Sequence, residues 1–189
     1  MEILSTELPD VLLFEPKRHV DKRGFFAEVW HQDRYREAGV QANMVQDNLS
    51  CSSQKGTIRG LHCQVAPFAQ AKLVHVLKGA IYDVAVDVRV GSPTFGKSVG
   101  FELSEENGRQ LYIPEGFLHG FVTLEETCIV SYKCSQYYHP ESDRSVAYND
   151  PTLSIQWPEL AVDFTLSDKD RNAPFLSDIA PLFTYGEVS

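Results

Sequence analysis

The stretch RGLHCQ (59–64) places a histidine, His62, close behind an arginine and a glycine. An imidazole titrates near neutral pH, so a histidine in a cavity can remove a carbon-bound proton or bind a metal ion, although it can also fill a core position. As a base it would need a partner that orients one ring nitrogen, and the spacing of the carboxylates does not single one out. By residue type alone, such a histidine is more often structural than catalytic.

A metal centre is the second kind of chemistry to consider. Small β-barrel metalloproteins hold their ion with a His-x-His pair, a glutamate and a distant histidine. The position two residues after His62 is Gln64, and His75 and His119 have no carboxylate partner at a matching spacing. The sequence therefore predicts a site without metal, and no residue is assigned as a metal ligand.

A tyrosine, Tyr132, lies in the alternating segment CIVSYKCSQYY (128–138). In a regular strand it shares a face with Val130 and Tyr138, so the two tyrosines are expected to face the same space. A phenol that faces a cavity can donate a proton. The apolar neighbour Val130 is equally consistent with a plain core position for Tyr132.

A lysine, Lys72, has the strand parity of Val74 and Val76, which would point its ammonium group into the interior. An inward lysine without a role is costly because its charge loses contact with water. The alternative is that Lys72 lies at a strand end, where its long side chain reaches solvent.

Strict alternation along a strand puts Arg59 and His62 on opposite faces, because they are three residues apart. Gly60 lies between them and could carry a β-bulge that brings both side chains to one cavity. We therefore expect a bulge or a local twist at Gly60.

The elements that must position these side chains are mainly β-strands. Short segments of strand character recur between glycines and prolines up to about residue 150, which is typical of an antiparallel sandwich or barrel. A helix is expected over 32–39, closed by Gly39, and short helices or ordered loops are expected in the tail after Ser167. The predicted strands cover 24–30, 42–50, 56–62, 72–79, 80–88, 96–104, 109–116, 119–125 and 128–138.

The composition sets the class of protein. The chain has 189 residues, of which 43% are hydrophobic and 11% aromatic, so residues 1–189 are expected to form a single domain with a real core. The net charge of -9 and the lack of a basic run argue against a nucleic-acid partner. A few focused arginines could still hold a phosphate inside such an acidic protein.

The expected location is the cytoplasm, with reduced thiols. The start of the chain has no secretory pattern, and no apolar stretch is long enough to span a membrane, so no membrane partner is expected. The four cysteines show no Cys-x-x-Cys spacing of a zinc or redox site.

Taken together and in order, these segments resemble the dTDP-4-dehydrorhamnose 3,5-epimerase family from about residue 10 to residue 171. The segments that carry the resemblance are DKRGFFAEVW, VQDNLS, IRGLHCQ, AKLVHVLKGAIYDVAVDVRVGSPTFG, QLYIPEGFLHGF, SYKCSQYYHPESDRS, YNDPTLSIQWP and LSDKD. The resemblance implies an all-β, double-stranded jelly roll of the cupin type with short peripheral helices, mainly in the C-terminal tail. It also implies a homodimer that works without metal or other cofactor.

The implied reaction is an isomerisation. A dTDP-linked 4-keto-6-deoxyglucose loses and regains a proton beside its C4 ketone, which inverts C5 and C3 in dTDP-rhamnose biosynthesis. The resemblance implies that His62 is the base, that Asp170 orients it, that Tyr132 is the opposing acid and that Lys72 supports the enolate oxygen. The implied substrate contacts are Arg23 and Arg59 for phosphates, Phe26 and Glu28 near the base, Tyr138 stacked on thymine, His119 near the sugar, and Gln46, Asp47, Asn48, Asp143 and Lys169 in the same site. A strand near Phe26 is expected to cross to the partner subunit.

Three positions depart from the usual family pattern. Cys63 follows His62 where an aromatic residue is common, Asp143 is one methylene shorter than the usual glutamate, and Tyr148 replaces a tryptophan. The rival functions are an epimerase of one carbon or of another nucleotide-linked keto sugar, a non-catalytic sugar-nucleotide-binding jelly roll, and a metal cupin such as a dioxygenase.

Overall fold

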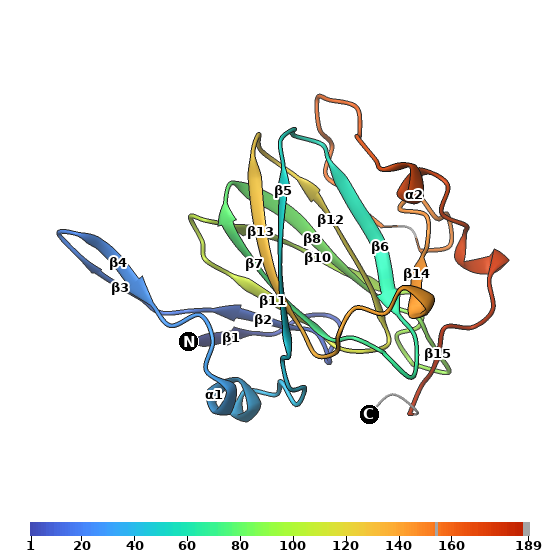
Figure 1. Cartoon of the computed structure of the whole chain (residues 1–189), viewed down its shortest axis with the longest axis horizontal. Helices are drawn as coiled ribbons and strands as arrows, with labels where there is room; N and C mark the ends of the chain where they lie inside the picture. The colour runs from blue at the N-terminus through green and yellow to red at the C-terminus, as the bar shows by residue number, and fades with distance from the viewer. Residues whose placement is uncertain (154, 187–189) are drawn as a thin grey trace.

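The computed structural model describes residues 1–153 and 155–186. Two antiparallel sheets pack face to face and form the body of the molecule (Figure 1). The first sheet has the strand order β1 (Glu2–Leu4), β2 (Leu12–Glu15), β11 (Gln110–Ile113), β7 (Lys72–Lys78), β13 (Cys128–Cys134), β5 (Gln46–Ser52). The second has the order β10 (Ser98–Ser104), β8 (Ala80–Asp87), β12 (Phe117–Thr123), β6 (Ile58–Gln64), β14 (Asp143–Ser145).

Alternation along the strands creates two apolar layers. In β8, Ile81 and Ala85 belong to the cluster between the two sheets, whereas Val84 and Val86 belong to a second cluster on the outer face of their sheet. Residues of the tail, such as Phe183, complete this outer cluster. The C-terminal segment is therefore anchored across the second sheet, beside the strand that carries His62.

The peripheral elements are short. Two 3-10 helices, η1 (Pro140–Ser142) and η2 (Leu176–Asp178), and the helix α2 (Asp168–Arg171) accompany the second sheet. The strand β9 (Arg89–Val90) pairs with β15 (Phe183–Thr184). The hairpin of β3 (Arg18–Asp21) and β4 (Gly24–Ala27) projects away from the body, at the left of Figure 1. None of the helices in the described residues is both long and apolar enough to cross a lipid bilayer.

The structure confirms the all-β, cupin-like fold. Each predicted strand is present, but several limits differ. The predicted strand 128–138 ends at Cys134, because its neighbours β7 and β5 begin opposite that residue and offer no further pairing. The predicted strand 24–30 ends at Ala27 for the same reason, since its single partner begins at Arg18.

The early helix, α1 (Gln32–Glu37), is shorter than the predicted range 32–39. Gly39 follows it with a φ of 112°, as expected for a glycine after a helix end. The short strands β1, β2, β3, β9, β14 and β15 were not expected from the sequence. They have between two and four residues, too few for an alternating pattern to stand out.

Candidate active site

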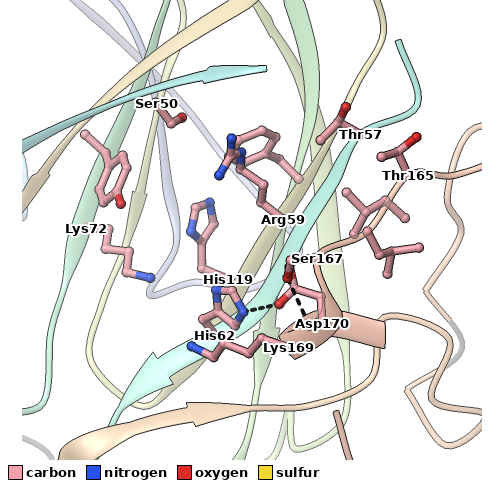
Figure 2. Close-up of a pocket in the computed structure, with 14 residues that line it drawn as sticks. Ser50, Thr57, Arg59, His62, Lys72, His119, Thr165, Ser167, Lys169 and Asp170 are labelled. Atoms are coloured by element: carbon pink, nitrogen blue, oxygen red, sulfur yellow. Dashed lines mark hydrogen bonds and ion pairs between the residues drawn. The ribbon is translucent and has the colours of Figure 1, made fainter. Parts of the chain in front are cut away.

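A cavity of about 360 Å³ opens between the two sheets beside α2 (Figure 2). Strands of both sheets and the tail supply its walls, so residues far apart in the sequence meet there. The predicted site residues that line it are Arg59, His62, Lys72, His119, Tyr132, Lys169 and Asp170.

A bulge at Gly60 brings Arg59 and His62 to this cavity, as the sequence predicted. Across the pair of strands, His62 lies opposite His119 and Arg59 lies opposite Phe121, so β6 has one more residue than β12 in this interval. Gly60 has a φ of 121°, and a Cβ there would lie 2.5 Å from the Cα of Gly120. Only glycine allows this close approach of the two backbones.

His62 is held by a carboxylate from the tail. Its Nε2 lies 2.5 Å from Oδ1 of Asp170, the contact drawn as a dashed line in Figure 2. A carboxylate only accepts, so Nε2 carries the proton and Nδ1 keeps a free lone pair. The helix α2 fixes this acid, because the Ser167 hydroxyl caps α2 by accepting from the backbone N–H of Asp170 at 3.1 Å.

Asp170 is ionised in this arrangement. Burial by itself would raise the pKa of Asp170, since the side chain is only 5% exposed. The hydrogen bond and charge of His62 outweigh that effect, with help from Ser167 and the Gly60 backbone, and the pKa is lowered. An ionised Asp170 stabilises an imidazolium, which is what a base becomes after taking a proton.

Tyr132 reaches the same cavity from the other sheet. It lies on β13, whereas His62 lies on β6, so the phenol and the imidazole approach from opposite walls. Burial raises the pKa of Tyr132, and the nearby Asp143 acts in the same direction. The phenol therefore keeps its proton at neutral pH and can donate it.

Lys72 also faces inward, as its parity predicted. It lies opposite Cys134 in the strand pair and shares a face with Val74 and Val76 of the core. Burial lowers the pKa of Lys72. An ammonium group in such surroundings stabilises a developing negative charge more strongly than it would in water.

A second histidine–aspartate pair lies deeper. The Nε2 of His119 is 2.7 Å from Oδ1 of Asp83, and both side chains are buried. Asp83 was not singled out in the sequence, although a signal was present: it interrupts the apolar face formed by Ile81 and Ala85. Ser50 was also missed, and its buried hydroxyl lines the cavity without a hydrogen-bond partner among the described residues.

The cavity continues into a polar cleft of about 440 Å³. Lys169 donates to Oδ2 of Asp143 at 2.5 Å, and the Tyr138 hydroxyl lies 3.4 Å from the same oxygen. Tyr138 and Tyr132 line this cleft together, as predicted, although Tyr138 lies beyond the end of β13 and strand parity is not the reason. Further predicted residues that line the cleft are Gln46 and Asn48.

Four predicted substrate residues are not brought to the cavity within one chain. Asp47 lies on the other face of β5 from Asn48 and pairs with Lys133. The other three belong to the region of the projecting hairpin. They are Arg23, which pairs with Asp21, Phe26, which is 73% exposed, and Glu28, which pairs with Arg34.

Across residues 1–153 and 155–186, no group of three or more histidine, cysteine, aspartate or glutamate side chains is arranged to hold a metal ion. The four cysteines, Cys51, Cys63, Cys128 and Cys134, are free thiols.

Comparison with known proteins gives full-length matches. The profile of the dTDP-4-dehydrorhamnose 3,5-epimerase family matches residues 5–178. The dTDP-4-dehydrorhamnose 3,5-epimerase of Sinorhizobium fredii is 46% identical over 188 residues, which cover 100% of this chain and 96% of that protein.

Solved structures agree with the sequence matches. The dTDP-6-deoxy-D-glucose-3,5-epimerase of Legionella pneumophila, in complex with dTDP-4-keto-L-rhamnose, superposes with a TM-score of 0.93 at 49% identity, over 97% of this chain and 98% of that one. A more distant structure is a 3'-monoepimerase from Streptomyces bikiniensis in complex with dTDP-quinovose. It has a TM-score of 0.88 at 34% identity, over 96% of this chain and 92% of that one.

Proposed function

The chain belongs to the dTDP-4-dehydrorhamnose 3,5-epimerase family and is an isomerase of that family, and we propose that His62, Tyr132 and Lys72 carry out its chemistry. One observation carries the assignment of these residues. A histidine paired with an ionised aspartate on one wall faces a protonated tyrosine on the other, with a lysine in the same cavity. A base and an acid on opposite sides are what an inversion at carbon needs.

The first step is removal of a proton beside the ketone. His62 Nδ1 takes the proton from the carbon next to C4, the electron pair of the broken C–H bond forms a double bond to C4, and the π pair of the ketone moves onto its oxygen. The resulting enolate is stabilised by the Lys72 ammonium group. Asp170 stabilises the imidazolium that forms on His62.

The second step is delivery of a proton to the other face. Tyr132 gives its phenolic proton to the same carbon, and the ketone is restored with the configuration inverted. Solvent then takes the proton from His62 and returns one to Tyr132. C5 and C3 both neighbour C4, so the same groups can act on both carbons after the sugar shifts in the cavity.

The nucleotide end of the substrate is proposed to lie toward Arg59, with Tyr138 stacked on the thymine. The Arg59 guanidinium lies at the mouth of the cavity, oriented by its contacts to the Ser52 hydroxyl at 3.0 Å and the Cys51 carbonyl at 3.2 Å. These two contacts leave further N–H groups free for a phosphate.

Replacing Arg59 with alanine is expected to weaken binding of dTDP by about ten- to a hundredfold, because a charge-assisted hydrogen bond to phosphate is lost. Isothermal titration calorimetry at two salt concentrations measures both the affinity and its salt dependence. Arg109→Ala is a matched control, since Arg109 pairs with Glu15 of β2 and lines neither the cavity nor the cleft. Unchanged affinity in Arg59→Ala would assign this arginine to structure alone.

A homodimer is proposed to complete the site. The β3–β4 hairpin stands off the body and exposes Val20, Phe25 and Phe26 by 78%, 59% and 73%. Such an apolar surface on a projecting element needs a cover. In such a dimer, the hairpin of one subunit would lie against the cavity of the other subunit. Arg23 and Phe26 of the hairpin would then contact the nucleotide bound in that cavity.

Mixing two defective chains tests this arrangement. A His62→Ala chain keeps an intact hairpin, and an Arg23→Ala/Phe26→Ala chain keeps an intact catalytic cavity. In a mixed dimer, one site combines the intact cavity with the intact hairpin, so we expect the KM of that site to return close to the wild-type value. The variants are mixed after reversible dissociation, and activity is measured at low substrate. A mixture that is no more active than the sum of its parts would place the hairpin outside the site.

The number of inverted carbons is tested directly. Turnover of dTDP-4-keto-6-deoxyglucose in deuterated water should place deuterium at both C3 and C5, as read by NMR or mass spectrometry of the product. The likeness to a 3'-monoepimerase gives the alternative, in which deuterium enters only at C3. We also propose a cytoplasmic location, which is consistent with the four free thiols.

A further inference from the structure

The interior between the two sheets holds an acid that the steps above do not use, Asp83. Asp83 is fully buried, and its Oδ1 accepts a hydrogen bond from Nε2 of His119. Its Oδ2 is buried without a hydrogen-bond partner in the described part of the chain. A buried carboxylate oxygen without a partner is costly, so its retention calls for a compensating positive charge nearby.

Lys72 is the candidate for that charge. It has no ion pair within 4 Å among residues 1–153 and 155–186, and it lines the same cavity as His119, the hydrogen-bond partner of Asp83. The Asp83 carboxylate is among the groups that raise the pKa of the Lys72 ammonium group. The two residues come from different sheets, Lys72 from β7 and Asp83 from β8, and both point into the space between them.

We propose that Asp83 is a positioning residue, the buried counter-charge that keeps Lys72 protonated for enolate stabilisation and holds His119 with its proton on Nε2. This inference rests on the role proposed above for Lys72. Asp83 acts through Lys72 and His119 and does not itself touch the substrate.

The other groups around Lys72 cannot replace Asp83. Burial lowers the pKa of Lys72, and the neighbours that oppose this are Cys134, Cys63, Asp143 and Asp83. Burial also raises the pKa of the two cysteines, to about 12 for Cys63, so both are neutral thiols at neutral pH and supply no charge.

Among the remaining groups, Asp143 is already bound to Lys169 at 2.5 Å. His62 faces the same cavity and becomes positive during the reaction, which disfavours a charged Lys72 at that moment. Tyr132 keeps its proton. The negative charge left over to balance Lys72 is therefore that of Asp83.

His119 does not cancel that charge. Burial lowers the pKa of His119, although Asp83 opposes the shift, so the ring is neutral at neutral pH. Because Asp83 can only accept, the proton of the neutral ring lies on Nε2 and Nδ1 is left as an acceptor. Asp83 thus determines which nitrogen of His119 donates and which accepts, and it balances the charge of Lys72 on the opposite sheet.

The test is Asp83→Asn, which keeps the shape and removes the charge. Lys72 should then lose its proton at a lower pH, because the carboxylate that raises its pKa is gone while burial remains. The pKa is read from NMR of ¹³C-labelled lysine, with the Lys72 signal identified by its absence in Lys72→Met. The alkaline limb of the pH–rate profile should move to lower pH by the same amount, with a loss of activity of roughly tenfold at alkaline pH, which corresponds to ~1.4 kcal/mol.

Glu15→Gln is the matched control, since it removes one carboxylate from the partly exposed ion pair with Arg109, outside the cavity. It should leave the Lys72 titration and the alkaline limb unchanged. An Asp83→Asn protein that is folded but titrates at Lys72 like the wild type would overturn the proposal.

Urea unfolding gives a second test, which also serves if Asp83→Asn is destabilised: the double variant with Lys72→Met is compared with Asp83→Asn alone. Removing both charges should raise the urea midpoint above that of Asp83→Asn alone, because the uncompensated lysine is gone. A double variant no more stable than the single one would overturn the proposal. The NMR and urea measurements need no substrate, so full activity in Lys72→Met would reject the catalytic role of Lys72 without touching its coupling to Asp83.

Discussion

Replacing His62 with alanine is expected to abolish both epimerisation and exchange of the C5 proton with deuterated water. Without Nδ1 of His62 no group is placed to remove the carbon-bound proton, so no enolate forms and neither process can start. Loss of a general base typically costs about a hundred- to ten-thousandfold, and we expect the upper end because the C–H bond is a poor acid. Two quantities are measured for the variant and the wild type: kcat for inversion, and the rate at which deuterium enters the substrate.

Two variants bracket this result. Asp170→Asn should be intermediate, because the amide oxygen can still accept from Nε2 at the position of the present 2.5 Å contact but no longer stabilises the imidazolium. His75→Asn is the control, since His75 points away from the cavity on the other face of β7 from Val74 and should leave the rate unchanged. A His62→Ala protein that still exchanges the C5 proton would place the base elsewhere, with His119 the first residue to examine.

Part of the geometry of the candidate site follows from the alternation of side chains along the strands. The strand pattern placed Lys72 and Tyr132 on inward faces, and the structure agrees, because both lie in regular strands where alternation holds. Arg59 and His62 needed a departure from alternation, and Gly60 was the visible sign of it. Tyr138 lines the same cleft as Tyr132, but it lies in a loop, where strand alternation does not predict the direction of a side chain.

Contacts between distant segments were harder to predict. Asp170 was assigned to His62 through the family resemblance, because a separation of 108 residues leaves no spacing rule to apply. Asp83 could have been found from its strand, since a charge on a buried face stands out between Ile81 and Ala85. Its pairing with His119 depends on the register of β8 with β12, which only the folded chain reveals.

The projecting hairpin marks another limit of the sequence. Its strands have four residues each, and Phe26 is exposed although it is strongly apolar. A pattern of apolar residues predicts burial but does not say whether the cover comes from the same chain or from a second one. The family resemblance supplied the partner subunit, and the exposed side chains are consistent with it.

Changing Tyr132 to phenylalanine should separate inversion from exchange. The ring and its packing remain, while the donor that burial keeps protonated is removed. His62 can still take the proton and form the enolate, so deuterium should continue to enter with the configuration retained. Delivery to the opposite face should fall by about a hundredfold or more, the typical contribution of a positioned acid. Chiral analysis of the deuterated product measures both outcomes in one experiment.

Tyr82→Phe is the matched control for this change. Tyr82 is also partly buried with a pKa raised by burial, but it packs in the cluster on the outer face of the second sheet, away from the cavity. It should invert the substrate at the wild-type rate. A Tyr132→Phe protein that also inverts at that rate would show that the proton on the second face comes from another donor. Loss of exchange together with inversion would instead mean that Tyr132 is needed to form the enolate. The two successive steps, proton removal by His62 and then proton delivery by Tyr132, would have to be replaced by a single step in which both residues act.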